Sequence, residues 1–204
     1  MGELVAACVA GLYTLEEGVR LVGARGKMMQ GLPAGGAMVS LGAGEKEVEA
    51  EVRRYGDAVE IAAVNGPGQT VISGDEWAVQ EVAREFEGRG VKTRKLVVSH
   101  AFHSRRMDGM KEGFGRVAEG VRYQKPTKEM VSNVSGKGSG EEVRRGEYWV
   151  RQAREVVRFW EGVQALKEAG AGTYVELGPK GVLLGLVAGC LEGGEAVLVP
   201  SISQ

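Results

Sequence analysis

The chain has 204 residues, of which 43% are hydrophobic and 26% charged, and its net charge at pH 7 is −1. A chain of this length can bury a sizeable core in one domain or in two small ones. The balanced charge argues against a nucleic-acid or polybasic membrane partner, and no apolar run approaches the roughly 18 residues of a membrane span. No basic segment follows Met1, so we expect no signal peptide and a cytoplasmic location. Cys8 and Cys190 lie in apolar patterns and predict reduced core residues rather than a disulfide.

The first 34 residues predict two helices. The first ends at Gly11, and the second begins after Thr14, with Glu17 spaced for a capping box. Arg25 lies beside the apolar stripe of the second helix, one turn after Leu21. That stripe, which we expect to face the core, is formed by Leu15, Val19, Val22 and Met29.

Residues 35–98 alternate between strand and helix patterns in the order βαββαβ, which is that of a ferredoxin-like unit. A Gly-Pro-Gly turn at 66–68 joins the two middle strands. Asp75 is placed to cap the second helix of the unit.

Residues 99–204 predict helices alternating with strands, which favours a parallel α/β sheet. A helix follows the histidines, a strand is expected within 125–136, and the amphipathic stretch 148–170 is a long helix that could be broken. An apolar helix at 182–191 and a closing strand at 196–202 complete the chain. We therefore expect a large α/β subdomain, residues 1–34 and 99–204, with the ferredoxin-like subdomain, residues 35–98, inserted into it.

Both histidines of the chain, His100 and His103, lie in one short segment. A metal site would need at least a third protein ligand, and no nearby Cys, His or carboxylate pattern supplies one, so we predict no metal. Two readings stay open from the pattern alone. The imidazoles cap backbone groups of a loop, or one of them is a general base for a nucleophile located elsewhere.

Arg25 also has two interpretations. An arginine at the edge of a helix stripe usually lies with its stem on apolar surface and its charge in water or in a surface ion pair. Alternatively, its guanidinium binds a carboxylate through two parallel hydrogen bonds.

The whole chain, Met1 to about Ser201, resembles the acyltransferase domain of modular polyketide synthases and the related malonyl-CoA:acyl-carrier-protein transacylases. Six segments carry the resemblance in the right order. They are GELVAACVAG, RLVGARGKMMQ, AAVNGPGQTVISG, SHAFHS, YWVRQAREVVRF and VELGPKGVLLGL. The resemblance implies an α/β-hydrolase-like parallel-sheet domain, here partial, with the ferredoxin-like subdomain inserted.

The resemblance also implies catalytic roles. His103, the second histidine of HAFH, would be the base that activates a serine. The backbone carbonyl of Gln152 would orient that histidine in place of the aspartate of an ordinary triad. The family's nucleophile sits in Gly-His-Ser-x-Gly-Glu, and this chain begins Met-Gly-Glu. The serine would therefore lie just before Met1, whose backbone amide would help to stabilise the oxyanion, so we expect the chain as written to be inactive.

Other residues match substrate-binding positions of the family. Arg25 would hold the free carboxylate of the malonyl group. His100 and Phe102 would belong to the box that correlates with extender-unit choice, here of the malonyl type, and Asn65 would line the acyl-CoA cleft. The sequence departs from the family at Ser-Arg-Arg-Met, where relatives usually have Ser-Pro-Leu-Met. The two arginines, Arg105 and Arg106, could attract CoA phosphates or form a solvated face, which we favour.

The implied reaction is acyl transfer from malonyl-CoA, through a serine ester, to the phosphopantetheine thiol of an acyl-carrier protein, in polyketide or fatty acid biosynthesis. No metal or redox cofactor is expected, and the other domains of a polyketide synthase are expected partners in cis. Two alternatives remain: a non-catalytic carrier-protein-binding remnant, and a truncated product without a role. In a truncated chain we expect exposed apolar faces on the first helix and on the helix at 182–191.

Overall fold

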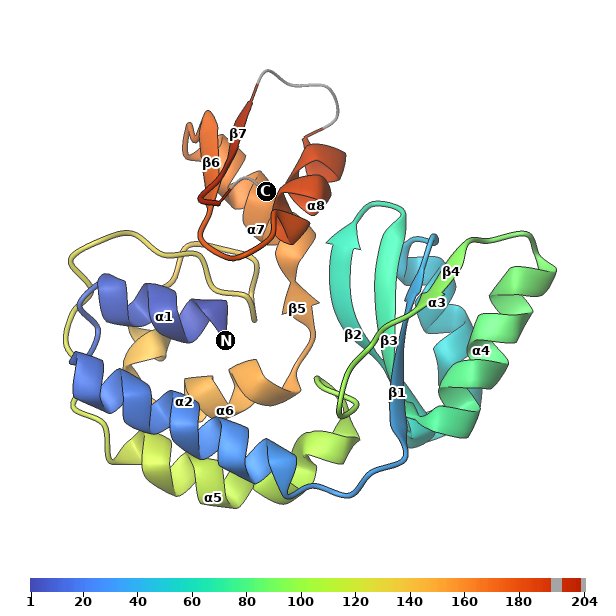
Figure 1. Ribbon diagram of the computed structural model, residues 1–204, viewed down its shortest axis with the longest axis horizontal. Helices are drawn as coiled ribbons and strands as arrows, with labels where there is room; N and C mark the ends of the chain where they lie inside the picture. Colours follow the sequence, from blue (N-terminus) through green and yellow to red (C-terminus); the bar gives the residue numbers. More distant parts are fainter. Residues whose placement is uncertain (192–195, 203–204) are drawn as a thin grey trace.

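The computed structural model describes residues 1–191 and 196–202. Four helices pack together at one side of the molecule (Figure 1): α1 (Gly2–Val9), α2 (Leu15–Gln30), α5 (Asp108–Glu119) and α6 (Gly146–Arg154). Their shared core contains Leu4, Leu21, Phe114 and Trp149, all nearly inaccessible to solvent. Short 3₁₀ turns, η2 (Arg105–Met107) and η3 (Glu141–Arg144), precede α5 and α6.

Helix α2 begins as the sequence predicts but buries a different face. The predicted capping box is present, with the Thr14 hydroxyl accepting from the Glu17 amide. The predicted inward stripe is wrong for Leu15 and Val19, which are 69% and 63% exposed, whereas Val22 and Met29 do pack against the core. The buried positions of α2 are Gly18, Leu21 and Arg25. This rotation turns Arg25 from the edge of the helix into its buried face.

The ferredoxin-like unit forms a separate core beside the helices. Its strands are β1 (Gly36–Leu41), β2 (Val59–Gly66), β3 (Gln69–Asp75) and β4 (Thr93–Lys95), arranged antiparallel in the order β4-β1-β3-β2. Helices α3 (Glu45–Val52) and α4 (Glu76–Gly88) pack on this sheet, and a 3₁₀ segment, η1 (Arg53–Ala58), follows α3. The core includes Val48, Ile72, Val79 and Phe86. The order of strands and helices along the chain is the βαββαβ order that the sequence predicts.

The long helix predicted at 148–170 is broken, as the sequence allowed. Helix α6 ends at Arg154, and α7 (Phe159–Glu168) begins five residues later. Between them, β5 (Val157–Arg158) pairs with β2 in parallel and extends the ferredoxin-like sheet to five strands. The segment between α6 and α7 therefore joins the helical part of the molecule to the ferredoxin-like sheet through backbone pairing. The subdomain boundaries at 34/35 and 98/99 stay a prediction.

The C-terminal part is a small α/β layer (Figure 1). Strands β6 (Thr173–Glu176) and β7 (Val197–Pro200) pair in parallel, and α7 and α8 (Val182–Cys190) pack beside them. The strand expected within 125–136 is reduced to an isolated bridge between Val131 and Gly138. The molecule is thus a mixed α/β fold whose parallel pairings are short.

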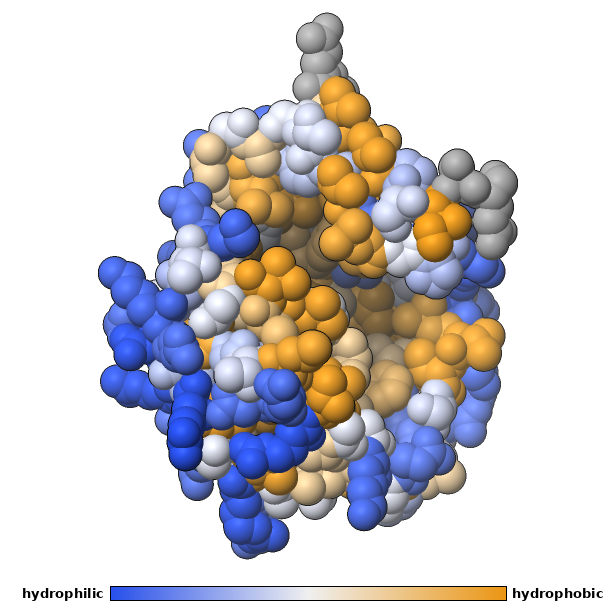
Figure 2. Space-filling model, turned by 60° about the vertical axis from the view of Figure 1, so that its left-hand side comes forward, coloured by the Kyte–Doolittle hydropathy of each residue, from blue (hydrophilic) through white to orange (hydrophobic). Residues whose placement is uncertain are grey.

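Apolar side chains remain on the surface of α1 and α8, as expected. Figure 2 shows apolar side chains gathered around a hollow of the molecular face. The exposed apolar residues of these two helices include Val5, Val9, Val182 and Leu183. Within 1–191 and 196–202, none of the helices has both the length and the apolar character needed to cross a bilayer.

Candidate functional site

His103 occupies a strained loop between β4 and η2. Its φ is +56°, in the left-handed region that a residue with a side chain rarely adopts. The next residue, Ser104, is fully buried, donates to the Ala101 carbonyl at 2.7 Å and accepts from the Arg106 amide at 3.3 Å. Strain of this kind persists only where the surroundings hold it, and it is common at functional sites.

The imidazole of His103 is oriented by a backbone carbonyl. Its Nδ1 lies 2.9 Å from the carbonyl oxygen of Glu155, and because a carbonyl only accepts, Nδ1 must donate. In the neutral ring the proton is then on Nδ1, which leaves the lone pair of Nε2 free to accept a proton.

The carbonyl partner of His103 differs from the prediction. We expected the backbone carbonyl of Gln152, but the acceptor is Glu155, three residues further along. Gln152 lies inside α6, where carbonyls of the helix body point along its axis, whereas Glu155 follows the last helical residue and is extended. Gln152 nevertheless belongs to the site, since its side-chain oxygen accepts from Nη1 of Arg25 at 2.5 Å.

Arg25 is a buried cation with few partners. The residue is only 4% exposed, and its Nε has no hydrogen-bond partner among the described residues. Burial lowers the pKa of its guanidinium, although the nearby Glu3 opposes this shift. A buried guanidinium with open donors is suited to bind an anion such as a carboxylate. The surface interpretation of Arg25 is therefore wrong, while the carboxylate-binding role stays a prediction.

A polar network that the sequence did not reveal lies beneath these residues. Glu3, 6% exposed, accepts from the Tyr148 hydroxyl, which also contacts the Ser132 hydroxyl at 2.7 Å. Burial raises the pKa of the Glu3 carboxyl, and the hydrogen bond from Tyr148 opposes this shift. Burial likewise raises the pKa of Tyr148. The first turn of α1, which carries Glu3, is thus attached to α6.

Charge effects on pKa values connect the α-amine of Met1, the guanidinium of Arg25 and the imidazole of His103. Burial, and then the positive charge of Arg25, lower the pKa of His103 from 6.5 to about 4, and the α-amine of Met1 adds to the effect. Burial and Arg25 also lower the pKa of that amine. The Met1 nitrogen, the Arg25 guanidinium and the His103 imidazole are therefore close enough to interact. His103 is held neutral at physiological pH, the state in which it can act as a base.

The other predicted site residues have structural partners of their own. Nε2 of His100 lies 3.2 Å from the Leu32 carbonyl, and its ring centroid is 6.2 Å from that of Phe102. The backbone carbonyl of Asn65, near the end of β2, accepts from the Cys190 thiol at 3.2 Å. These contacts fix the residues without testing their predicted roles in substrate binding.

The solvated face that we favoured is found only in part, because the Arg105 side chain is 45% exposed whereas that of Arg106 is only 21% exposed. Both pair with the Asp75 carboxylate, Arg105 at 2.8 Å, and Arg106 also donates to the Ala34 carbonyl. These contacts hold the histidine loop against the small sheet. Because Asp75 is engaged in this way, it occupies the N-cap position of α4 without accepting a capping hydrogen bond.

No group of three or more potential metal-binding side chains occurs within the part of the chain that the structure describes. The expectation that the protein needs no cofactor stays a prediction, as does its cytoplasmic location.

The α/β fold with a ferredoxin-like sheet, the histidine oriented by a carbonyl and the buried arginine agree with the class of acyl-transferring enzymes that the sequence resembles. Comparison with known families agrees: the profile of the acyl transferase domain matches residues 1–204. The chain belongs to the acyl transferase domain family.

Relatives of known sequence and structure come from polyketide synthases and acyl-carrier-protein transacylases. The chain is 51% identical over 201 residues to polyketide synthase GfsA of Streptomyces halstedii, covering 96% of this chain and 3% of that protein. It superposes with a TM-score of 0.96 and 45% identity on the acyltransferase domain from the second module of the salinomycin polyketide synthase, covering all of this chain and 48% of that one. For the malonyl CoA-acyl carrier protein transacylase of Clostridium perfringens, the TM-score is 0.91 at 28% identity, with 100% and 65% covered. The chain thus spans about half to two thirds of these two structures.

Proposed function

We propose that this chain supplies the base and the carboxylate-binding arginine of an acyltransferase that moves a malonyl-type group from CoA to the phosphopantetheine thiol of an acyl-carrier protein, in polyketide or fatty acid biosynthesis. The supporting observation is that a neutral, Nδ1-protonated His103 lies within electrostatic range of the buried guanidinium of Arg25, whose Nε has no hydrogen-bond partner among the described residues. The first group can accept a proton, and the second can hold the free carboxylate of the acyl group.

The proposed nucleophile is a serine attached to the nitrogen of Met1 in a longer polypeptide. A residue at that position would be near both the base and the arginine, because the charge at the Met1 nitrogen affects the pKa of His103 and is itself affected by Arg25. The amide formed at Met1 would then be placed to donate a hydrogen bond to the oxyanion.

The reaction then proceeds in two transfers. His103 Nε2 accepts the serine proton as the serine oxygen attacks the thioester carbon, and the carbon–sulfur bond breaks while the imidazolium returns the proton to the CoA thiolate. In the second transfer, Nε2 accepts the proton of the carrier-protein thiol, whose sulfur attacks the serine ester. The proton returns to the serine oxygen as the ester bond breaks, and the site is restored.

A complete acyltransferase domain that contains this chain would test the proposal. Intact-mass spectrometry after malonyl-CoA treatment should detect a malonyl ester in the unaltered domain and only a trace in His103→Gln, whereas the matched His100→Gln variant should still be acylated. Acylation of the His103 variant at an unchanged rate would refute the role of the base. A domain that binds carrier protein without being acylated would support the non-catalytic alternative.

A further inference from the structure

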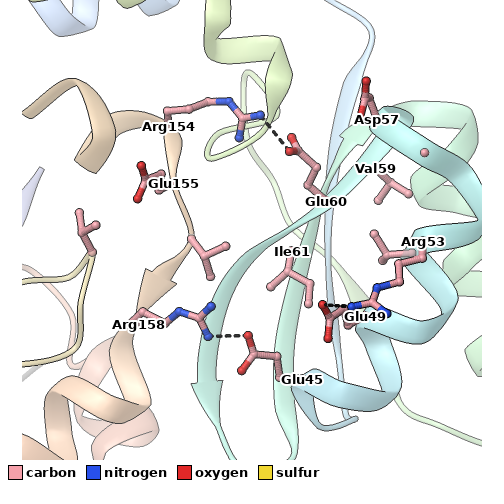
Figure 3. Close-up of a pocket in the computed structure, with 14 residues that line it drawn as sticks. Glu45, Glu49, Arg53, Asp57, Val59, Glu60, Ile61, Arg154, Glu155 and Arg158 are labelled. Atoms are coloured by element: carbon pink, nitrogen blue, oxygen red, sulfur yellow. Dashed lines mark hydrogen bonds and ion pairs between the residues drawn. The ribbon is translucent and has the colours of Figure 1, made fainter. Parts of the chain in front are cut away.

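The segment that carries His103 and the segment that carries its carbonyl partner meet at one carboxylate of the small sheet. Glu60 is on β2, and its Oε2 accepts the backbone N–H of Arg105 at 2.6 Å, two residues after His103. Its other oxygen, Oε1, accepts from Nη2 of Arg154 at 2.9 Å, one residue before Glu155. Figure 3 shows Arg154 and Glu60 reaching toward each other from the two sides of a pocket.

Arg154 also contacts the element that follows the histidine loop. Its Nε donates to Oδ1 of Asp108, the first residue of α5, at 2.9 Å. The side chains of Arg154 and Glu60 are only 21% and 33% exposed, so the pair is partly shielded from water. Partly buried, charge-assisted hydrogen bonds fix geometry better than exposed ion pairs do.

We propose that Glu60 is a positioning residue for His103: its carboxylate holds the loop of the imidazole and the segment of the Glu155 carbonyl in a fixed relation to each other. The left-handed backbone of His103 requires such support, because a free loop would relax to a less strained conformation. The inference rests on the proposed function only in regarding the imidazole as a base, since the orientation of the ring can be measured separately.

The interface offers a matched control. Arg158, on β5, donates to Glu45 at the start of α3 and is drawn in the same pocket (Figure 3). This pair crosses the interface between the same two parts of the molecule. It makes no hydrogen bond to the segment of His103, so its loss should loosen the interface without releasing the imidazole.

The measurement is nuclear magnetic resonance of the untagged chain labelled with ¹⁵N-histidine, which carries only two imidazoles. A His100→Asn variant assigns them. In the unaltered chain, His103 should remain the Nδ1-protonated tautomer between about pH 5 and pH 8. In Glu60→Gln and Arg154→Met it should populate both tautomers, and its pKa should rise toward 6.5 as the ring becomes solvated. Arg154→Lys should give an intermediate result, and Glu45→Gln should match the unaltered chain.

Three results would contradict the positioning role of Glu60. A lower pKa of His103 in Glu60→Gln would mean that the carboxylate acts only through its charge, and unchanged tautomers would mean that it does not position the ring. An equal effect of Glu45→Gln would reduce the proposal to general loosening of the interface. Any of these three results overturns it, and an unchanged His100 signal verifies that each variant is folded.

A second readout separates this inference from the proposed function. In a complete acyltransferase domain, Glu60→Gln should lower kcat by about ten- to a hundredfold with little change in KM, because a small misplacement of a catalytic group slows the reaction itself. If His103→Gln left transfer intact, the proposed function would fail. The change of tautomer in Glu60→Gln would still establish the positioning role.

Discussion

Replacing Arg25 by methionine is expected to stabilise the unliganded chain while it removes affinity for malonate. The guanidinium is almost completely buried, its nearest hydrogen-bond partner is the neutral side chain of Gln152, and its Nε has no partner among the described residues. It also lies near the α-amine of Met1, whose pKa it lowers. Methionine keeps an unbranched apolar side chain in the same space and removes the charge.

The expected gain is the cost of burying the charge less two smaller returns, the hydrogen bond to Gln152 and the attraction of Glu3, which burial weakens by raising the pKa of that carboxyl. Burying a charge costs several kcal/mol even after the protein relaxes around it. The hydrogen bond from Arg25 to Gln152 returns about 1.5–3 kcal/mol, because one partner is charged. The difference predicts that Arg25→Met raises the free energy of unfolding by about 1–2 kcal/mol, within the range observed when apolar residues replace buried ionic groups.

Urea unfolding at pH 7 measures this difference, and Arg20→Met is the matched control. Arg20 is on the same helix but is exposed, with one hydrogen bond to the Gly120 carbonyl, so its replacement should change stability by less than about 0.5 kcal/mol. Saturating malonate should raise the unfolding midpoint of the unaltered chain, and acetate at equal ionic strength should not. A loss of stability in Arg25→Met, or a midpoint shift by malonate that survives the substitution, would refute the reasoning.

Three further predictions concern stability. The pKa of His103 is lower in the folded chain than its unfolded value of 6.5, so the unfolded chain binds more protons between pH 6.5 and about pH 4, and the free energy of unfolding falls as the pH is lowered through this window. In urea titrations across the window, the free energy of unfolding of His103→Gln should fall by on the order of 2 kcal/mol less than that of the unaltered chain. Tyr148→Phe should lower the free energy of unfolding by about 1–3 kcal/mol, because the buried Glu3 carboxyl loses a donor. An unchanged urea midpoint would contradict this prediction. Gly74→Ala should cost about 3 kcal/mol or more in the same assay, since its Cβ would lie 2.2 Å from the Ala58 carbonyl oxygen; a smaller loss would mean that the strand shifts freely.

Local rules predicted the elements of the ferredoxin-like unit better than they predicted the buried face of α2. The alternation of apolar and polar residues in a strand and the residue types of a turn depend only on a few neighbouring positions, so the βαββαβ order could be inferred from the sequence. The buried face of α2 depends on what packs against it. Gly18, Leu21 and Arg25 face inward because Gly18 allows close contact with Tyr13 and Arg25 reaches Gln152. An apolar count favours Leu15 and Val19 instead, and both are exposed.

The site was predictable where a side chain carries the chemistry and not where the backbone does. The histidine loop and Arg25 were identified through family motifs, since their side chains have defined chemistry. The carbonyl of Glu155 carries no signature, because every residue has one, and its selection depends on where α6 ends. Asp75 reads as a helix cap but is diverted to the two arginines after the histidine loop, at a sequence separation of about 30 residues.

The geometry of His103 therefore depends on both parts of the molecule. The large subdomain supplies the ring and, through the segment after α6, the carbonyl that orients it. The small sheet supplies Glu60, which contacts the backbone just beyond the ring and the side chain just before the carbonyl. A strained loop with contacts to only one of these parts would have one fixed end and one free end, and its imidazole could turn. The ferredoxin-like sheet thus helps to fix the orientation of the His103 imidazole, in addition to any surface that it offers to a substrate.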